Sequence, residues 1–167
     1  RENKAHTEKM KAIDAQYAAD SEKILQDSLD KKRSAYNTYY TSVIADIRKD
    51  QDRISKESSS IDKRQDNAAF GFFNIKAVMK GYDELISKEK IAVEKIKTER
   101  DKLIQDKNNG KISGEDFLVR QEELDAAEEA AMASIEDLEK KQKTSLDKFI
   151  GAIMAAVQVV GQSIQQI

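Results

Sequence analysis

The absence of proline constrains this chain most strongly. Its 167 residues contain none, whereas average usage would place about eight prolines in a chain of this length. Proline breaks helices because it lacks a backbone N–H and its ring clashes with the preceding turn. Only six glycines interrupt the chain, and 36% of its residues are charged, against about 25% in typical proteins. The composition therefore predicts an all-α fold, with residues 1–167 forming a single helical domain.

One helix–turn–helix corner is marked by local signals around residues 106–116. Asn108 and Asn109 precede Gly110, and glycine suits the left-handed position that follows many helices. Ser113 can then cap a new helix, with Asp116 three residues later in the capping-box position. We expect one helix to end near residue 108 and another to begin at residue 114.

Apolar residues follow a regular three–four spacing through the chain, as in a coiled coil. Before the corner this seam is interrupted only by Glu89 and Arg100, and it comprises Phe72, Ile75, Met79, Tyr82, Ile86, Val93, Ile96 and Leu103. The same rhythm occurs earlier, at Met10, Ile13, Tyr17, Tyr36, Tyr40, Val43 and Ile47. Between residues 50 and 67, however, Ile54 and Ile61 are the only large apolar residues.

This polar stretch predicts a second corner near residues 55–60, and hence an elongated antiparallel three-helix bundle or coiled-coil-like rod. Its helices would span roughly residues 3–55, 60–108 and 114–166. In that register one aromatic layer would form from Tyr36, Tyr39, Tyr40, Phe70, Phe72, Phe73 and Phe149. The alternative is one very long helix over residues 1–107 with a shorter antiparallel helix over 114–167, because no proline or glycine interrupts residues 3–70.

Residues 149–167 carry no charge, in contrast to the rest of the chain. In the predicted bundle residues 150–167 would lie alongside residues 53–70, which are strongly polar and could not cover them. A helix that is apolar over most of its circumference is normally buried on several sides. We therefore expect an external partner for this segment, contacted by Phe149, Ile150, Ile153, Met154, Val157, Val160, Ile164 and Ile167.

The leading hypothesis is a non-enzymatic structural or interaction protein. It would self-associate, or dock into a larger assembly, through residues 149–167. A secreted membrane-active protein, such as a translocator or pore-forming component, is the alternative, because an uncharged segment of this length approaches that of a membrane span. A third hypothesis is an adaptor or chaperone with an open apolar groove. The chain begins with Arg1 rather than Met, which favours a secreted or periplasmic location over a cytoplasmic one.

Residues that could support catalysis or cofactor binding are sparse. The chain has no cysteine, and His6 is its single histidine. The corner is similar to a calcium-binding loop, but Lys107 would occupy a ligand position. Basic and acidic residues number 29 and 31 and are interleaved, whereas nucleic-acid binding needs a basic stripe. We expect no enzyme activity, cofactor, metal, nucleic acid or small-molecule substrate, and Glu89 is the one acidic residue on a buried seam.

Overall fold

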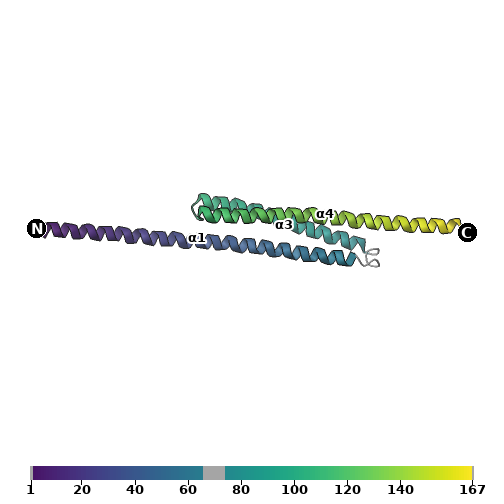
Figure 1. Ribbon diagram of the computed structural model, residues 1–167, viewed down its shortest axis with the longest axis horizontal. Coiled ribbons are helices and arrows are strands. Elements are labelled where there is room, and N and C mark those ends of the chain that lie inside the picture. The colour runs from purple at the N-terminus through teal and green to yellow at the C-terminus, as the bar shows by residue number, and fades with distance from the viewer. Residues whose placement is uncertain (1, 66–73, 167) are drawn as a thin grey trace.

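The computed structural model of the protein describes residues 2–65 and 74–166, and Figure 1 shows their arrangement. They form helix α1 (Glu2–Gln65), helix α3 (Ile75–Asn108) and helix α4 (Gly114–Gln165). These described ranges contain no strand. The all-α prediction is confirmed.

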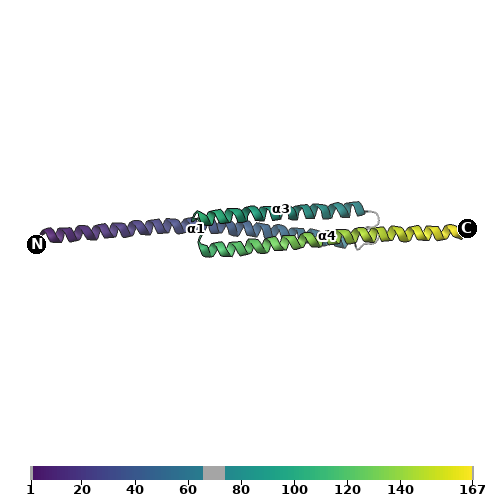
Figure 2. The same ribbon diagram turned by 90° about the horizontal axis from the view of Figure 1, so that it is seen from above.

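The three helices pack side by side as a bundle in which α3 runs antiparallel to both α1 and α4 (Figures 1 and 2). The Glu57 carboxylate of α1 accepts a hydrogen bond from the Lys88 ammonium of α3 at 2.8 Å. Gln51 of α1 donates to the backbone carbonyl of Ala127 in α4, also at 2.8 Å. Because α1 and α3 pack on each other, the alternative of one unbroken helix over residues 1–107 is wrong.

The predicted corner near residues 55–60 is also wrong, because α1 continues to Gln65. Ile54 and Ser58 in that stretch are both buried, and Lys141 of α4 donates to the Ser58 hydroxyl at 3.3 Å. Serine is a modest helix former, and no proline or glycine stops the helix here. Helix α1 therefore ends at Gln65, and the antiparallel helix α3 begins at Ile75.

Among the described members of the predicted aromatic layer, the tyrosines do not come together with Phe149. Because α1 continues past the predicted corner, each α1 residue lies opposite a residue further along α3 than predicted. Tyr39 and Tyr40 therefore meet the C-terminal end of α3. The Tyr40 hydroxyl donates to Asp106 at 2.7 Å, and the Tyr39 hydroxyl donates to Glu99. Half-buried Phe149 follows the level at which Lys141 of α4 contacts Asp62 near the end of α1, far from Tyr40, and Phe70, Phe72 and Phe73 lie outside the described residues.

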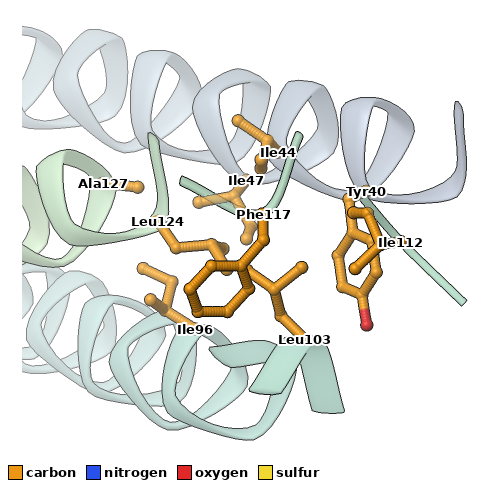
Figure 3. Packing of buried hydrophobic residues seen from close by; sticks show 9 residues of the cluster. All are labelled: Tyr40, Ile44, Ile47, Ile96, Leu103, Ile112, Phe117, Leu124 and Ala127. Atoms are coloured by element: carbon orange, nitrogen blue, oxygen red, sulfur yellow. The ribbon is translucent and has the colours of Figure 1, made fainter. Parts of the chain in front are cut away.

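The core consists of two clusters stacked along the bundle. The cluster nearer the Gly110 corner brings Phe117 against the α3 seam at Leu103 (Figure 3), and contains Tyr40, Ile44, Ile47, Ile96, Leu103, Ile112, Phe117, Leu124 and Ala127. The second comprises Ile54, Val78, Tyr82, Leu85, Ile86, Val93, Ala131, Ile135 and Leu138. Burying a large side chain of this kind stabilises the fold by about 1.5–3 kcal/mol.

The corner between α3 and α4 has the predicted geometry. Gly110 adopts a left-handed backbone with φ of 69°. Ser113 caps α4, since its hydroxyl oxygen accepts a hydrogen bond from the Asp116 backbone N–H at 3.0 Å. These caps satisfy backbone groups that a helix end leaves without intrahelical partners.

Two helical extensions project from opposite ends of the bundle (Figures 1 and 2). The first is the N-terminal part of α1, residues 4–32, in which every residue is exposed; we call it the N-terminal arm. The second is the end of α4, residues 149–165, which we call the C-terminal segment. Because α1 and α4 are parallel, the two extensions run in the same chain direction.

Candidate functional site

The C-terminal segment is a continuous extension of α4 whose large apolar side chains face outward. Of the predicted contact residues, Phe149 is half-buried and Ile167 lies outside the described residues. The other six have exposed fractions of 40–67% and comprise Ile150, Ile153, Met154, Val157, Val160 and Ile164. Leu146 and Val159 are exposed beside them.

The exposure arises because the neighbouring helices stop. The expected pairing of residues 150–167 with residues 53–70 is wrong: Lys141 already lies beside Asp62, at 3.0 Å, close to the end of α1 at Gln65. On the other side, Gln142 contacts Asp83 at 2.6 Å, and α3 begins only a short distance further along, at Ile75. The C-terminal segment thus extends beyond both described partner helices.

The apolar stripe of the C-terminal segment lies on a different side of α4 from the face that this helix buries within the bundle. Ala131, Leu138 and Ser145 are buried at seven-residue intervals. Leu146, Ile153 and Val160 repeat the same interval one residue later, which corresponds to about 100° around a helix. Seven residues before Leu146 is Glu139, which pairs with Lys90 of α3 at 3.9 Å. The stripe therefore prolongs a side of α4 that is exposed within the bundle, where Met132 and Glu139 lie.

The surface of the C-terminal segment also contains a shallow apolar depression. Its lining consists of Ile153, Ala156, Val157 and Val160. These positions have the spacing i, i+3, i+4, i+7, which is that of the four-residue holes that receive a side chain from a partner helix in a coiled coil. All four residues that line this depression are apolar.

A membrane is the other environment that the composition of this surface permits. Within the described residues, α4 is the one helix that is long and apolar enough to cross a bilayer, and little of its apolar stretch is buried. Only the length and composition of the helix support a membrane span. The segment also contains the polar residues Gln158, Gln162 and Gln165. Such residues make an unfavourable single span.

Glu89 is the principal buried acidic group of the bundle. Its side chain is 1% exposed between Ile86 and Val93 on the α3 seam, and Oε2 accepts no hydrogen bond from the described residues. Burial raises the pKa of this carboxyl, while a hydrogen bond with Ser134 of α4 acts in the opposite direction. Among the described residues, no group of three His, Cys, Asp or Glu side chains could hold a metal ion.

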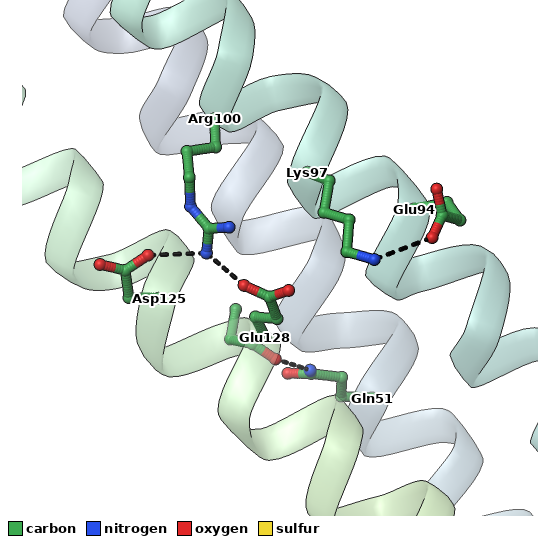
Figure 4. Close-up of polar contacts among 7 residues, drawn as sticks. Gln51, Glu94, Lys97, Arg100, Asp125 and Glu128 are labelled. Atoms are coloured by element: carbon green, nitrogen blue, oxygen red, sulfur yellow. Dashed lines mark hydrogen bonds and ion pairs between the residues drawn. The ribbon is translucent and has the colours of Figure 1, made fainter.

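Other polar groups in the interior are paired across helices. Arg100, the second interruption of the seam, is held by Glu128 and by Asp125, the latter at 2.6 Å (Figure 4). Its contact with Glu128 raises the pKa of the guanidinium. Tyr82 donates a hydrogen bond to Asp62 at 2.7 Å. The pKa of the Tyr82 phenol is raised mainly by burial and also by this hydrogen bond. These pairs join α3 to α4 and to α1.

The sequence interpretation did not identify the N-terminal arm as a separate surface, because Met10, Ile13 and Tyr17 share the rhythm of the seam. Their exposed fractions are 46%, 60% and 76%. Helix α3 does not extend far enough to cover these three residues. It ends at Asn108, close to the point along α1 where Tyr40 contacts α3. Their three–four spacing alone could not reveal this, because it depends on where α1 turns.

Comparison with known proteins gives no relative from which a function could be transferred: no family model, curated protein or solved structure matches the chain.

Proposed function

We propose that this is a non-enzymatic structural or interaction protein that self-associates, or joins a larger assembly, through its C-terminal segment. The observation that carries the proposal is the outward-facing apolar stripe beyond the ends of α1 and α3. It is continuous with a well-packed helix, so the surface is held in place by the bundle.

The energetics favour a partner for this stripe. Burying one Val, Leu, Ile or Met side chain contributes about 1.5–3 kcal/mol. Seven such residues, from Ile150 to Ile164, are exposed on the C-terminal segment. Their combined burial is comparable with the roughly 4–15 kcal/mol that association costs in lost translational and rotational freedom. Because the segment is already helical, little further ordering is required.

The shape of the surface favours a helix as the partner. The depression formed by Ile153, Ala156, Val157 and Val160 accepts one side chain of a facing helix. Gly151 and Gly161 have open space around their α-carbons, and small residues allow two helices to approach closely. Helix-to-helix burial is therefore the binding mode that we assign to this segment.

The test is the solution mass of the full chain and of a chain that ends at Lys148, measured by light scattering over a range of concentrations. We expect the full chain to exceed its monomer mass of 18.9 kDa and the shortened chain to have the mass of its own, smaller monomer. Circular dichroism of both chains checks that the bundle remains folded. Equal association of the two chains would contradict the proposal.

A second candidate function is membrane interaction through the same segment, favoured by the length and composition of the uncharged part of α4. Neutral phosphatidylcholine vesicles are the suitable probe, because the segment lacks the cationic side chains that bind anionic lipid. Flotation of the full chain, but not of the chain ending at Lys148, would favour this function if both chains are monomeric without lipid.

A further inference from the structure

The apolar stripe occupies one narrow side of the last turns of α4. At about 100° per residue, its exposed members fall within an arc of about 80° around the helix. They are Leu146, Ile150, Ile153, Val157, Val160 and Ile164. Met154 and Val159 are also exposed and lie outside this arc. A stripe this narrow corresponds to the seam between two helices of a coiled coil, rather than to a helix that is buried on all sides.

The side of the helix opposite the stripe is polar but uncharged. Gln158, Gln162 and Gln165 lie about 100–160° around the helix from the middle of the stripe. Their amide groups keep contact with water if one helix covers the stripe, whereas in a bilayer core they would lose it at a cost in free energy. Residues 149–165 also lack the Lys and Arg side chains that hold an interfacial helix on anionic lipid. This division into two sides favours a single protein helix over lipid as the occupant.

The stripe is complementary to itself when two copies run antiparallel. About a two-fold axis at the level of Ala155, residues whose numbers add up to 310 lie opposite one another. Every residue of the stripe then faces another residue of the stripe, in the pairs Leu146–Ile164, Ile150–Val160 and Ile153–Val157. The apolar depression on the segment receives Ile153 of the second copy, as a coiled-coil hole receives a side chain.

The distribution of charge favours the antiparallel direction over the parallel one. Glu139 lies seven residues before Leu146, on the line of the stripe, and is exposed. A parallel pair would place the two bundles side by side and bring Glu139 of each copy towards the other, which is unfavourable for like charges. In the antiparallel pair only the last turns of α4 overlap. The charged residue nearest the segment, Lys148, then lies opposite neutral Gln162.

Resting on the proposed function, we propose that the partner of the C-terminal segment is the same segment of a second copy, packed antiparallel about a two-fold axis at Ala155. Such an interface uses the same surface on both copies and closes after two. The two bundles project in opposite directions. In this register Gln165 lies opposite Ser145 of the second copy, past the level at which Lys141 contacts Asp62 of α1. The paired stretch therefore coincides with the part of α4 that extends beyond the bundle.

Introduced cysteines test both the direction and the register, because the chain has no cysteine of its own. The informative full-length variants are Ile150→Cys and Val160→Cys, whose side chains are exposed in the single chain. In the proposed pair these two positions face each other, whereas each lies about 15 Å along the helix from its own counterpart. A disulfide requires α-carbons about 4.4–6.8 Å apart.

We expect the mass of the parent, measured by light scattering, to reach a limit at twice the 18.9 kDa of one chain, while a chain ending at Lys148 stays monomeric. Under mild oxidation above this association concentration, neither cysteine variant alone gives a covalent dimer, and their equimolar mixture does. The matched controls are Gln158→Cys and Gln162→Cys, on the far side of the helix. They should give no covalent dimer, alone or mixed.

Three results would overturn the inference and leave the proposed function intact. These are a covalent dimer of Ile150→Cys with itself, which indicates a parallel pair; a limiting mass above two copies; and an associated mixture that forms no disulfide. If the parent is monomeric at every concentration, self-association through the C-terminal segment fails as well. Flotation of that monomer with neutral phosphatidylcholine vesicles would then identify lipid as the occupant of the stripe.

Discussion

Replacing Glu89 with glutamine should stabilise the bundle at neutral pH. Glu89 is 1% exposed and its Oε2 accepts no hydrogen bond from the described residues. Leaving a buried polar group unsatisfied costs about 1–3 kcal/mol, and more when the group is charged. Glutamine has nearly the same shape as glutamate but carries no ionisable carboxyl group. We expect the free energy of unfolding at pH 8 to increase by about 1–3 kcal/mol.

The gain should depend on pH with a definite sign. Burial raises the pKa of Glu89 in the folded protein, so the folded state holds this proton at pH values where the unfolded chain has lost it. The contribution of Glu89 to stability is therefore fully present below its unfolded pKa and is lost as pH rises through its folded pKa. The glutamine variant lacks this loss, so its advantage should shrink as pH falls from 8 towards about 4, which is close to the ordinary pKa of a glutamate.

Thermal unfolding followed by circular dichroism, from pH 4 to pH 8, measures this effect. A change of 1–3 kcal/mol corresponds to an increase in Tm of about 3–9 °C for a chain of this size. The exposed Glu94→Gln variant on the same helix is the control, and should show little change at any pH. A Glu89→Gln variant that is less stable than the parent at pH 8, or whose Tm difference is independent of pH, would refute the reasoning.

Three further substitutions test the ends and the register of the helices. Tyr40→Phe removes the 2.7 Å hydrogen bond to buried Asp106, and should lower the free energy of unfolding by about 1–3 kcal/mol in urea titrations; an unchanged midpoint would contradict the assigned α1–α3 register. Ser113→Ala removes the cap of α4 and should cost about 1 kcal/mol by the same assay, whereas exposed Ser87→Ala should not. Gly110→Ala forces a β-carbon into a backbone with φ of 69° and should cost about 1–2 kcal/mol; a Tm equal to that of the parent would argue against the left-handed turn.

Local chemistry made the α3–α4 corner predictable. Gly110 and Ser113 each act through the conformation or hydrogen bonding of their own few neighbours, so their roles can be inferred without knowing the rest of the fold. The all-α class was predictable for a similar reason, since proline and glycine act on the local backbone. The seam at Tyr82, Ile86 and Val93 was also predictable from its spacing, and all three are buried.

The first turn was not predictable in this way. The polar residues around Ser58 indicated a break, but a polar residue can be buried when a partner satisfies it, as Lys141 does for Ser58. Because this turn was predicted too early in the chain, the predicted pairing of α1 residues with α3 residues was also wrong. Tyr40 was assigned to an aromatic layer and instead pairs with Asp106.

For the C-terminal segment, the apolar stripe was predictable from the sequence but its neighbours were not. Its apolar stripe was identified from the absence of charge and the three–four spacing, and the described residues of that stripe are exposed apart from half-buried Phe149. The expected neighbours, residues 53–70, were wrong, because α1 ends at Gln65 while α4 continues to Gln165. The N-terminal arm was missed for the same reason, since its lack of a neighbour depends on where α3 ends.

Hydrogen–deuterium exchange of the full chain at low and high protein concentration tests the central claim most directly. Backbone amides of an exposed helix end open locally with little cost, and burial against a partner slows their exchange. We predict that exchange in residues 149–165 slows as concentration rises, while exchange in the core around Leu103 and Leu138 does not change. Equally fast exchange in residues 149–165 at both concentrations would contradict self-association through the C-terminal segment.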